Sequence, residues 1–284
     1  MIICHSRKFI FIKTMKTAGT SLEVALSGLC SDNDILSPFG YMPDERLRLS
    51  KTGRKAQNYR YGFKEWRKLR NKQKLLALLT DYDRSRFKEH MSAAHVRREV
   101  GEEIWNSYYK FTVVRNPYDR FVSRYFFDMN EMKAGPLPHR LGDMTFGVDS
   151  PDTFIRYNAE RLNENWKIYS DGDESLMDKA VRFEAMEEDL GEVSERIGLS
   201  DNLYDTMRSI HTKTGTRPAA KSHVKDVLSL NDRLAVYLLC RREFELYGYE
   251  PGEDVEACLQ QKPRENESGS AGGAEILAWA SAGE

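Results

Sequence analysis

The chain has 284 residues and a formal net charge of −1, with 40% apolar and 31% charged residues. This length allows one large α/β domain with a full core, or at most two domains. The near-neutral balance excludes a global field that would recruit nucleic acid or a membrane surface. Because the sequence contains no signal-peptide pattern and no bilayer-length apolar run, we expect a cytoplasmic protein without a membrane span.

The four cysteines, Cys4, Cys30, Cys240 and Cys258, lie far apart in the sequence. No CxxC pair and no Cys/His ligand spacing occurs, so neither a zinc site nor a disulfide framework is indicated. Dispersed cysteines suit a reducing compartment, in agreement with a cytoplasmic location. We therefore predict no bound metal.

The first predicted unit is a strand, a tight loop and a helix. Residues 9–12 form a short apolar run typical of a buried parallel strand, and the loop 13–19 follows. Residues 20–29 are predicted to be helical, with Leu22 and Leu26 on one face. This succession of elements holds phosphates in nucleotide-binding α/β proteins.

The loop carries groups that an anion-binding site needs. Unpaired N–H groups at the start of a helix attract negative charge, and a glycine lets the backbone approach an anion closely. The candidate phosphate-binding residues are Lys16, Thr17, Ala18, Gly19, Thr20 and Ser21. The lysine precedes the glycine, so this is not a GxxxxGK[ST] motif, and a capped helix after a surface turn is the alternative reading.

Residues 44–74 are strongly basic, with twelve Lys and Arg against three acids and four interleaved aromatic side chains. We interpret residues 41–80 as a basic helical insertion. A solvated helical face is the usual meaning of such a charge run. An anionic glycan would also fit, because aromatic rings stack on sugars and basic groups attract carboxylates or sulfates.

The remaining elements alternate between helix and strand. Helices are predicted at 92–100, from Pro117 onward, at 186–197 and at 230–246, with buried strands at 111–114 and 180–183. Residues 252–284 are polar or rich in Gly and Ser toward their middle and indicate a flexible tail. The alternation predicts an α/β fold in one domain, with a P-loop-like parallel sheet flanked by helices.

A second candidate anchor lies at the end of the strand 111–114. Arg115 follows this strand, at the edge where ligands of open α/β sheets bind. Ser123 comes eight residues later in the following helix. A guanidinium fork and a nearby hydroxyl suit a phosphate monoester, although an ion pair of Arg115 with an acid is the alternative reading.

Taken together, the two segments resemble the sulfotransferases that use 3′-phosphoadenosine 5′-phosphosulfate (PAPS). Residues 16–21 are similar to the family's 5′-phosphosulfate loop, and Arg115-Asn116-Pro117 with Ser123 is similar to its 3′-phosphate element. The nearest branch is the one with the heparan-sulfate 2-O-sulfotransferases and related bacterial carbohydrate enzymes. Further matching segments extend the resemblance to about residues 8–251, so we expect a sulfotransferase domain at 1–251. Met15 stands where many relatives have proline.

The resemblance implies transfer of a sulfuryl group from PAPS to an acceptor hydroxyl, with 3′-phosphoadenosine 5′-phosphate (PAP) as product and no metal. The implied acceptor is a sugar or an anionic glycan, and nucleic acid is not an expected partner. Lys16 would stabilise the leaving phosphate during in-line displacement. Arg217 and Lys221 lie in a basic loop that would close over the nucleotide, although an ordinary solvated loop is the alternative.

The acceptor hydroxyl needs a base whose pKa lies near neutrality, which points to a histidine. His90 and His95 lie between the two anchors, where the 2-O branch places its base. We favour His90, in the string His90-Met91-Ser92-Ala93, and leave His95 open. On one helix these two rings would point in different directions, so only one would face the substrate.

Two alternative functions stay open. A P-loop nucleotide kinase shares the sheet and loop but needs magnesium ligands and a lysine after the glycine. A non-catalytic PAP-binding module would have lost His90 or Lys16, yet both are present.

Overall fold

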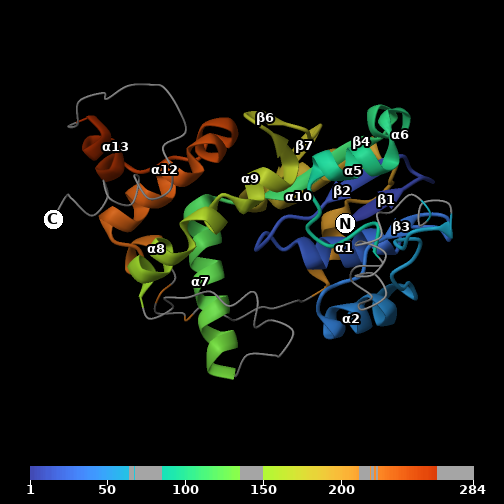
Figure 1. Ribbon diagram of the computed structural model, residues 1–284, viewed down its shortest axis with the longest axis horizontal. Helices are drawn as coiled ribbons and strands as arrows, with labels where there is room; N and C mark the ends of the chain where they lie inside the picture. The colour runs from blue at the N-terminus through green and yellow to red at the C-terminus, as the bar shows by residue number, and fades with distance from the viewer. Residues whose placement is uncertain are drawn as a thin grey trace. The chain divides into compact units, whose positions relative to one another are not determined.

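The computed structural model describes residues 1–63, 67, 85–134, 150–210, 218, 221 and 223–260 (Figure 1). Contacts divide the chain into two compact units. The first comprises residues 1–114 and 167–212, and the second comprises residues 115–166 and 213–284.

A five-stranded sheet forms the centre of the first unit, in the order β3-β1-β2-β4-β7. The strands are β1 (Ile2–Cys4), β2 (Phe9–Ile12), β3 (Ile35–Leu36), β4 (Tyr109–Val114) and β7 (Lys179–Arg182). β2, β4 and β7 are parallel, as predicted, but β1 runs antiparallel to both β2 and β3. The sheet is therefore mixed, because two short N-terminal strands, absent from the sequence prediction, extend its edge.

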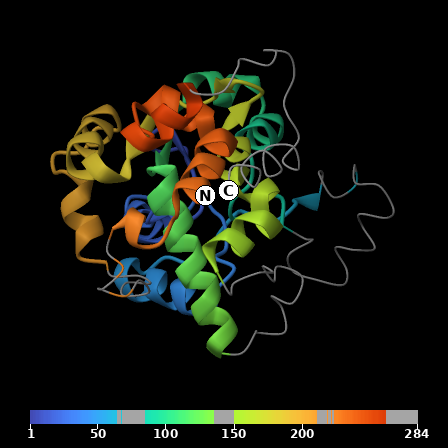
Figure 2. The same ribbon diagram turned by 90° about the vertical axis from the view of Figure 1, so that its left-hand side faces the viewer.

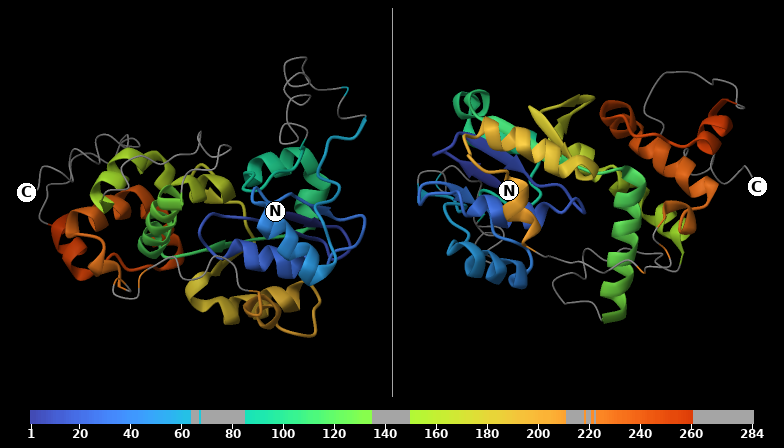
Figure 3. Two further views of the ribbon diagram at one scale, coloured as in Figure 1. Left: turned by 90° about the horizontal axis from the view of Figure 1, so that it is seen from below. Right: turned by 180° about the vertical axis from the view of Figure 1, so that it is seen from behind.

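Helices cover both faces of this sheet. α1 (Gly19–Ser27), α10 (Met186–Arg196) and α11 (Leu203–Arg208) share one apolar core with alternate strand residues such as Phe9, Phe11 and Phe111. α5 (Ala93–Val100) and α6 (Glu102–Ser107) lie on the opposite side from α10 and α11 (Figure 3). The predicted α/β fold class, with a sheet flanked by helices, is confirmed.

Shorter elements complete the first unit. They are α2 (Met42–Thr52), the small hairpin β5 (Ser170–Asp171) and β6 (Glu174–Ser175), and the 3₁₀ turn η2 (Phe183–Ala185). The helix starts and stops agree with the sequence signals, since Ser92 caps α5 and Gly101 ends it. The predicted strand 180–183 is shifted by one residue, because Phe183 already belongs to η2.

The second unit is helical in its described residues. It contains α7 (Pro117–Ala134), α8 (Pro151–Leu162), η4 (Val224–Asp226), α12 (Leu230–Tyr247) and α13 (Glu253–Gln260), and α9 (Glu164–Tyr169) spans the boundary to the first unit. α12 packs against both α7 and α8 (Figure 2). Aromatic side chains of α7 and α8, including Phe121, Tyr125 and Phe154, contribute to the apolar core of the second unit.

The C-terminal part differs from the sequence prediction at its start. Residues 253–260 fall in the predicted flexible tail but form α13, which buries Val255. Asp254 of this helix accepts hydrogen bonds from Arg233 of α12, at 2.7 and 2.5 Å. The rest of the predicted tail lies outside the described residues. Within the described ranges, no helix is long and apolar enough to cross a membrane.

Candidate active site

The loop between β2 and α1 has an unusual backbone. Lys16 and Ala18 have φ values of 60° and 61°, in the left-handed region that non-glycine residues rarely adopt. Ala18 is the N-cap of α1, so these two residues lead directly into the first helical turn. Left-handed residues at such a turn aim successive N–H groups into a concavity that binds anions. The backbone therefore supports the candidate phosphate loop.

Internal contacts hold this loop beside β4. The Thr14 hydroxyl donates to the Val113 carbonyl and lies 2.9 Å from the Thr17 hydroxyl. A Cβ at Gly19 would lie 3.1 Å from Cγ of Lys13, so the lack of a side chain at Gly19 leaves room for the Lys13 side chain. The position of Gly19 thus has a local packing reason in addition to the expected approach of an anion.

β4 ends at Val114 on the same sheet edge as the end of β2, because β2 and β4 are parallel and in register, and Arg115 is the next residue along the chain. It is half-buried and opens the second unit. Asn116 then caps α7, its side-chain oxygen accepting from the Tyr118 N–H at 3.0 Å, with Pro117 as the first helical residue. The sequence signal for this helix start is confirmed.

Two contacts anchor α7 within the second unit. Arg120 makes a buried bidentate ion pair with Glu243 of α12, at 2.6 and 2.7 Å. The Tyr118 hydroxyl donates to the Pro251 carbonyl at 3.1 Å, and its ring packs edge-on against Phe244. Phe244 and Pro251 therefore help to hold the helix that carries Ser123.

Of the predicted basic loop, the structure describes Lys221 but not Arg217, which lies outside the described residues. The Lys221 ammonium lies 6.0 Å from the ring centre of Phe126 on α7. Phe126 is three residues beyond Ser123, one helical turn along the same face. The Lys221 ammonium therefore lies near α7, beside a residue one helical turn from Ser123.

A buried ion network surrounds the start of the phosphate loop, and the sequence reading missed it. Lys13 is 3% exposed and pairs with Glu23 of α1 at 3.2 Å and with Glu89 at 2.5 Å. Glu23 also pairs with the fully buried Arg48 of α2. The ring of Phe39 lies under both cations, 4.3 Å from Lys13 and 4.0 Å from Arg48. The network fixes the loop's first residue.

His90 lies on this network. It occupies a turn before α5 with a φ of 56°, a left-handed conformation that costs about 1–2 kcal/mol outside glycine. Its Nδ1 lies 3.1 Å from the carbonyl oxygen of Lys13. Because a carbonyl only accepts, Nδ1 carries the proton, and Nε2 is the nitrogen that can take one up.

Burial lowers the pKa of His90 from 6.5 to about 4; Lys13 acts in the same direction and Glu89 opposes it. The ring is therefore neutral at neutral pH. A neutral imidazole is the form that can accept a proton. Negative charge of a bound donor near the ring would raise this pKa again.

His95 has a different environment. It lies on α5, its side chain is 44% exposed, and its Nε2 lies 3.6 Å from Glu99 one turn later. Since His90 precedes the helix, the expected helical offset between the two rings does not apply. They differ in location: His90 contacts the phosphate loop, whereas His95 contacts its own helix.

The basic segment is described only in part. Within α2, Arg48 is fully buried and belongs to the ion network, so it is not part of a solvated basic face. Arg46 and Lys51 of the same helix are exposed. The predicted insertion 41–80 therefore begins with a helix, and its residues 64–66 and 68–80 lie outside the described ranges.

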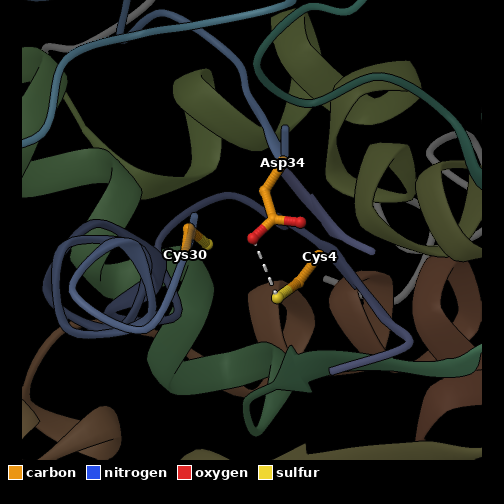
Figure 4. A group of neighbouring side chains, drawn as sticks. All are labelled: Cys4, Cys30 and Asp34. Carbon is orange, nitrogen blue, oxygen red and sulfur yellow. Dashed lines mark hydrogen bonds between the residues drawn. The ribbon is translucent and has the colours of Figure 1, made fainter. Parts of the chain in front are cut away.

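Two cysteines that are distant in sequence meet in the first unit. Cys4, Cys30 and Asp34 place their ligand atoms within 4.8 Å of one another (Figure 4). Asp34, however, already accepts from the backbone N–H and hydroxyl of Ser31, the same groups of Ser6, and the Cys4 thiol. The contact with Cys4 and burial raise the pKa of the Cys30 thiol. The cluster is a hydrogen-bonded anchor for the loop before β3.

Comparison with known proteins adds the family. The sequence matches the model described as "Sulfotransferase family" over residues 1–250, which spans both units. An uncharacterized protein of Archaeoglobus fulgidus is 28% identical over 116 residues, which are 40% of this chain and 87% of that protein. No solved structure matches. The family match covers both candidate anchors and His90, and the chain therefore belongs to the sulfotransferase family.

Proposed function

We propose that this protein transfers the sulfuryl group of PAPS to a hydroxyl of a carbohydrate acceptor and releases PAP. Membership of the sulfotransferase family supports sulfuryl transfer in general. The observation that carries the proposal further is the contact between His90 and Lys13, which puts the candidate base on the candidate phosphate loop. Both residues belong to the first unit, so the contact does not depend on how the units are arranged.

The proposed donor contacts follow from local structure in each unit. Residues 16–21 would receive the 5′-phosphosulfate through backbone N–H groups, hydroxyls and the Lys16 ammonium, supported by the left-handed loop. In the second unit, Arg115, Ser123 and Lys221 would receive the 3′-phosphate, and Arg217 would join them. The position of the Lys221 ammonium near Phe126 of α7, one helical turn from Ser123, supports the second assignment.

The proposed step is an in-line displacement at sulfur. As the acceptor oxygen forms its bond to sulfur, its proton passes to Nε2 of His90. The bond between sulfur and the bridging phosphate oxygen breaks, and that oxygen leaves on PAP with the electron pair. Lys16 would stabilise the leaving oxygen, and this charge grows in the transition state. The step uses no metal because the donor is already activated.

The acceptor class rests on resemblance and on the basic segment. The similarity to the heparan-sulfate 2-O branch and to bacterial carbohydrate enzymes favours a sugar, and the charge of residues 44–74 favours an anionic one. Neutralising Arg67, Lys68 and Arg70 together should raise the acceptor KM, most at low salt, and leave PAP binding unchanged. Acceptor kinetics equal to wild type at low ionic strength would contradict this role. A cytoplasmic location is part of the proposal.

Paired histidine variants test the proposed step. His90→Ala should lower the rate of PAP formation with acceptor by about 10²–10⁴, with PAP binding intact. His95→Ala is the matched control and should keep both properties. Equal rates for His90→Ala and wild type would remove His90 from the mechanism.

Nucleotide specificity separates the alternatives. PAP should raise the melting temperature of the wild-type protein, whereas ATP with Mg²⁺ should not. A kinase would show the reverse preference. A non-catalytic PAP-binding module would bind PAP and transfer no sulfuryl group to any acceptor.

A further inference from the structure

We propose that Glu89 is a positioning residue for His90: the Lys13 carbonyl holds the ring with Nε2 as the nitrogen that accepts a proton, and the carboxylate of Glu89 balances the charge that the ring then acquires. This inference rests on the proposed function of His90 as the base. Glu89 is not among the residues that the sequence singles out, and neither is Lys13.

Glu89 is held rigidly on both carboxylate oxygens. Oε1 accepts from the Lys13 ammonium at 2.5 Å, and Oε2 accepts from the N–H of Gly40 at 2.7 Å. Burial would raise the pKa of Glu89, but Lys13, His90 and these hydrogen bonds together hold it well below its ordinary value. Glu89 is therefore ionised across the working pH range, which makes it a poor base and a permanent negative charge.

One lysine organises both sides of the imidazole. The backbone carbonyl of Lys13 faces Nδ1 at 3.1 Å, while its side-chain ammonium holds the carboxylate that faces Nε2. The distance between Nε2 of His90 and Oε1 of Glu89 is 3.7 Å, too long for a hydrogen bond. Before proton uptake, Nε2 therefore makes no hydrogen bond with Glu89.

Proton uptake by His90 changes its interaction with Glu89. The Nε2–H of an imidazolium would point toward a fixed negative charge, and a small movement would close the 3.7 Å gap to a charge-assisted hydrogen bond. A carboxylate beside a histidine base stabilises the imidazolium, while the Lys13 carbonyl at Nδ1 sets the tautomer of the neutral ring. Glu89 would act in this way without contacting the substrate.

The network behind Lys13 explains why this carboxylate stays in place. Glu23 shares the charge of Lys13 at 3.2 Å and is itself fully buried. The Lys13 ammonium thus pairs with two carboxylates, those of Glu23 and Glu89. Its charge is balanced with Glu89 in its present position. The group facing the ring is fixed by residues of β2's end, α1 and the loop before α2.

Nuclear magnetic resonance of the imidazole nitrogens tests the positioning directly, without any substrate. At neutral pH the ¹⁵N shifts of His90 should report a neutral ring protonated at Nδ1. A ring protonated at Nε2 would overturn the inference, whatever the enzyme's activity proves to be.

Variants then test the charge. Glu89→Gln keeps the shape and removes the charge, so the titration midpoint of His90 should move to lower pH and kcat should fall about tenfold or more, with the KM for PAPS changed less than about twofold. Glu89→Asp should restore the midpoint toward wild type. Glu99→Gln is the matched control, because Glu99 faces His95 at a similar distance of 3.6 Å, and it should leave the His90 midpoint and kcat unchanged.

The two readouts separate failure of this inference from failure of the proposed function. An unchanged His90 midpoint and kcat in folded Glu89→Gln would overturn the role of Glu89, even if His90 proves to be the base. Should the wild-type protein transfer no sulfuryl group, the midpoint shift in Glu89→Gln still decides whether Glu89 controls the ring. If Glu89→Gln does not fold, Glu89→Asp decides. A His90 titration midpoint that differs from the wild-type value in Glu89→Asp would overturn the inference, and a midpoint equal to the wild-type value would support it.

Discussion

Replacing His90 should change how stability depends on pH. In the folded protein the pKa of His90 is about 4, against 6.5 for the ordinary side chain. As pH falls below 6.5, the unfolded chain takes up a proton that the folded chain refuses, so stability is lost progressively down to pH 4. From these two values, the loss between pH 7 and pH 5 is about 2 kcal/mol.

His90→Gln removes the titrating group, and its amide can still donate to the Lys13 carbonyl. The free energy of unfolding, measured with urea at pH 7 and pH 5, should therefore fall by about 2 kcal/mol less in His90→Gln than in wild type. Lys13, Glu89 and the amino group of Met1 also influence the pKa of His90. The carboxylates of the network titrate below this window, because their pKa values are lowered.

The control keeps the His90 ring: His95→Gln should retain the wild-type fall. An identical pH dependence in His90→Gln and wild type would instead mean that His90 binds protons as readily in the folded as in the unfolded chain.

Other substitutions test the remaining assignments. Lys16→Ala should lower turnover more than PAP affinity, because the charge it meets grows in the transition state; calorimetry with PAP and steady-state rates on one sample separate the two. Arg115→Ala should weaken PAP about tenfold or more in the same calorimetry, by loss of a charge-assisted bond, and unaltered affinity would mean that the second anchor is misassigned. Glu243→Gln leaves the buried Arg120 without its partner charge, which should cost about 3–5 kcal/mol in urea unfolding; a loss below 1 kcal/mol would contradict the buried pair.

Local patterns predicted the elements that carry the candidate site. The apolar run at 9–12, the glycine-bearing loop and the Asn116-Pro117 helix start each depend on neighbours in sequence, and the structure confirms them. The antiparallel β1 and β3 were missed because three- and two-residue strands carry too little pattern to be recognised. These short strands form because they pair with neighbouring strands, and the fold sets that pairing.

The electrostatic environment of the candidate base could not be predicted in the same way. Lys13 and Glu89 are 76 residues apart, and Arg48 and Glu23 are 25 apart, so no spacing rule links them. The left-handed turn at His90 is likewise not predictable from sequence, because even histidine, which is enriched at positive φ, adopts it only rarely. Residue type and motif pointed to His90 as a candidate base, whereas only the fold shows which charged groups surround its ring.

Sulfuryl transfer from PAPS to a hydroxyl can be measured with ³⁵S-labelled PAPS. The wild-type protein would be incubated with sugar, anionic glycan, phenol, lipid and peptide acceptors, with Lys16→Ala as the inactive control. We expect labelled product from a carbohydrate acceptor together with equimolar PAP, and a large loss of both with Lys16→Ala. PAP binding without transfer to any acceptor, or transfer that Lys16→Ala retains in full, would contradict this expectation.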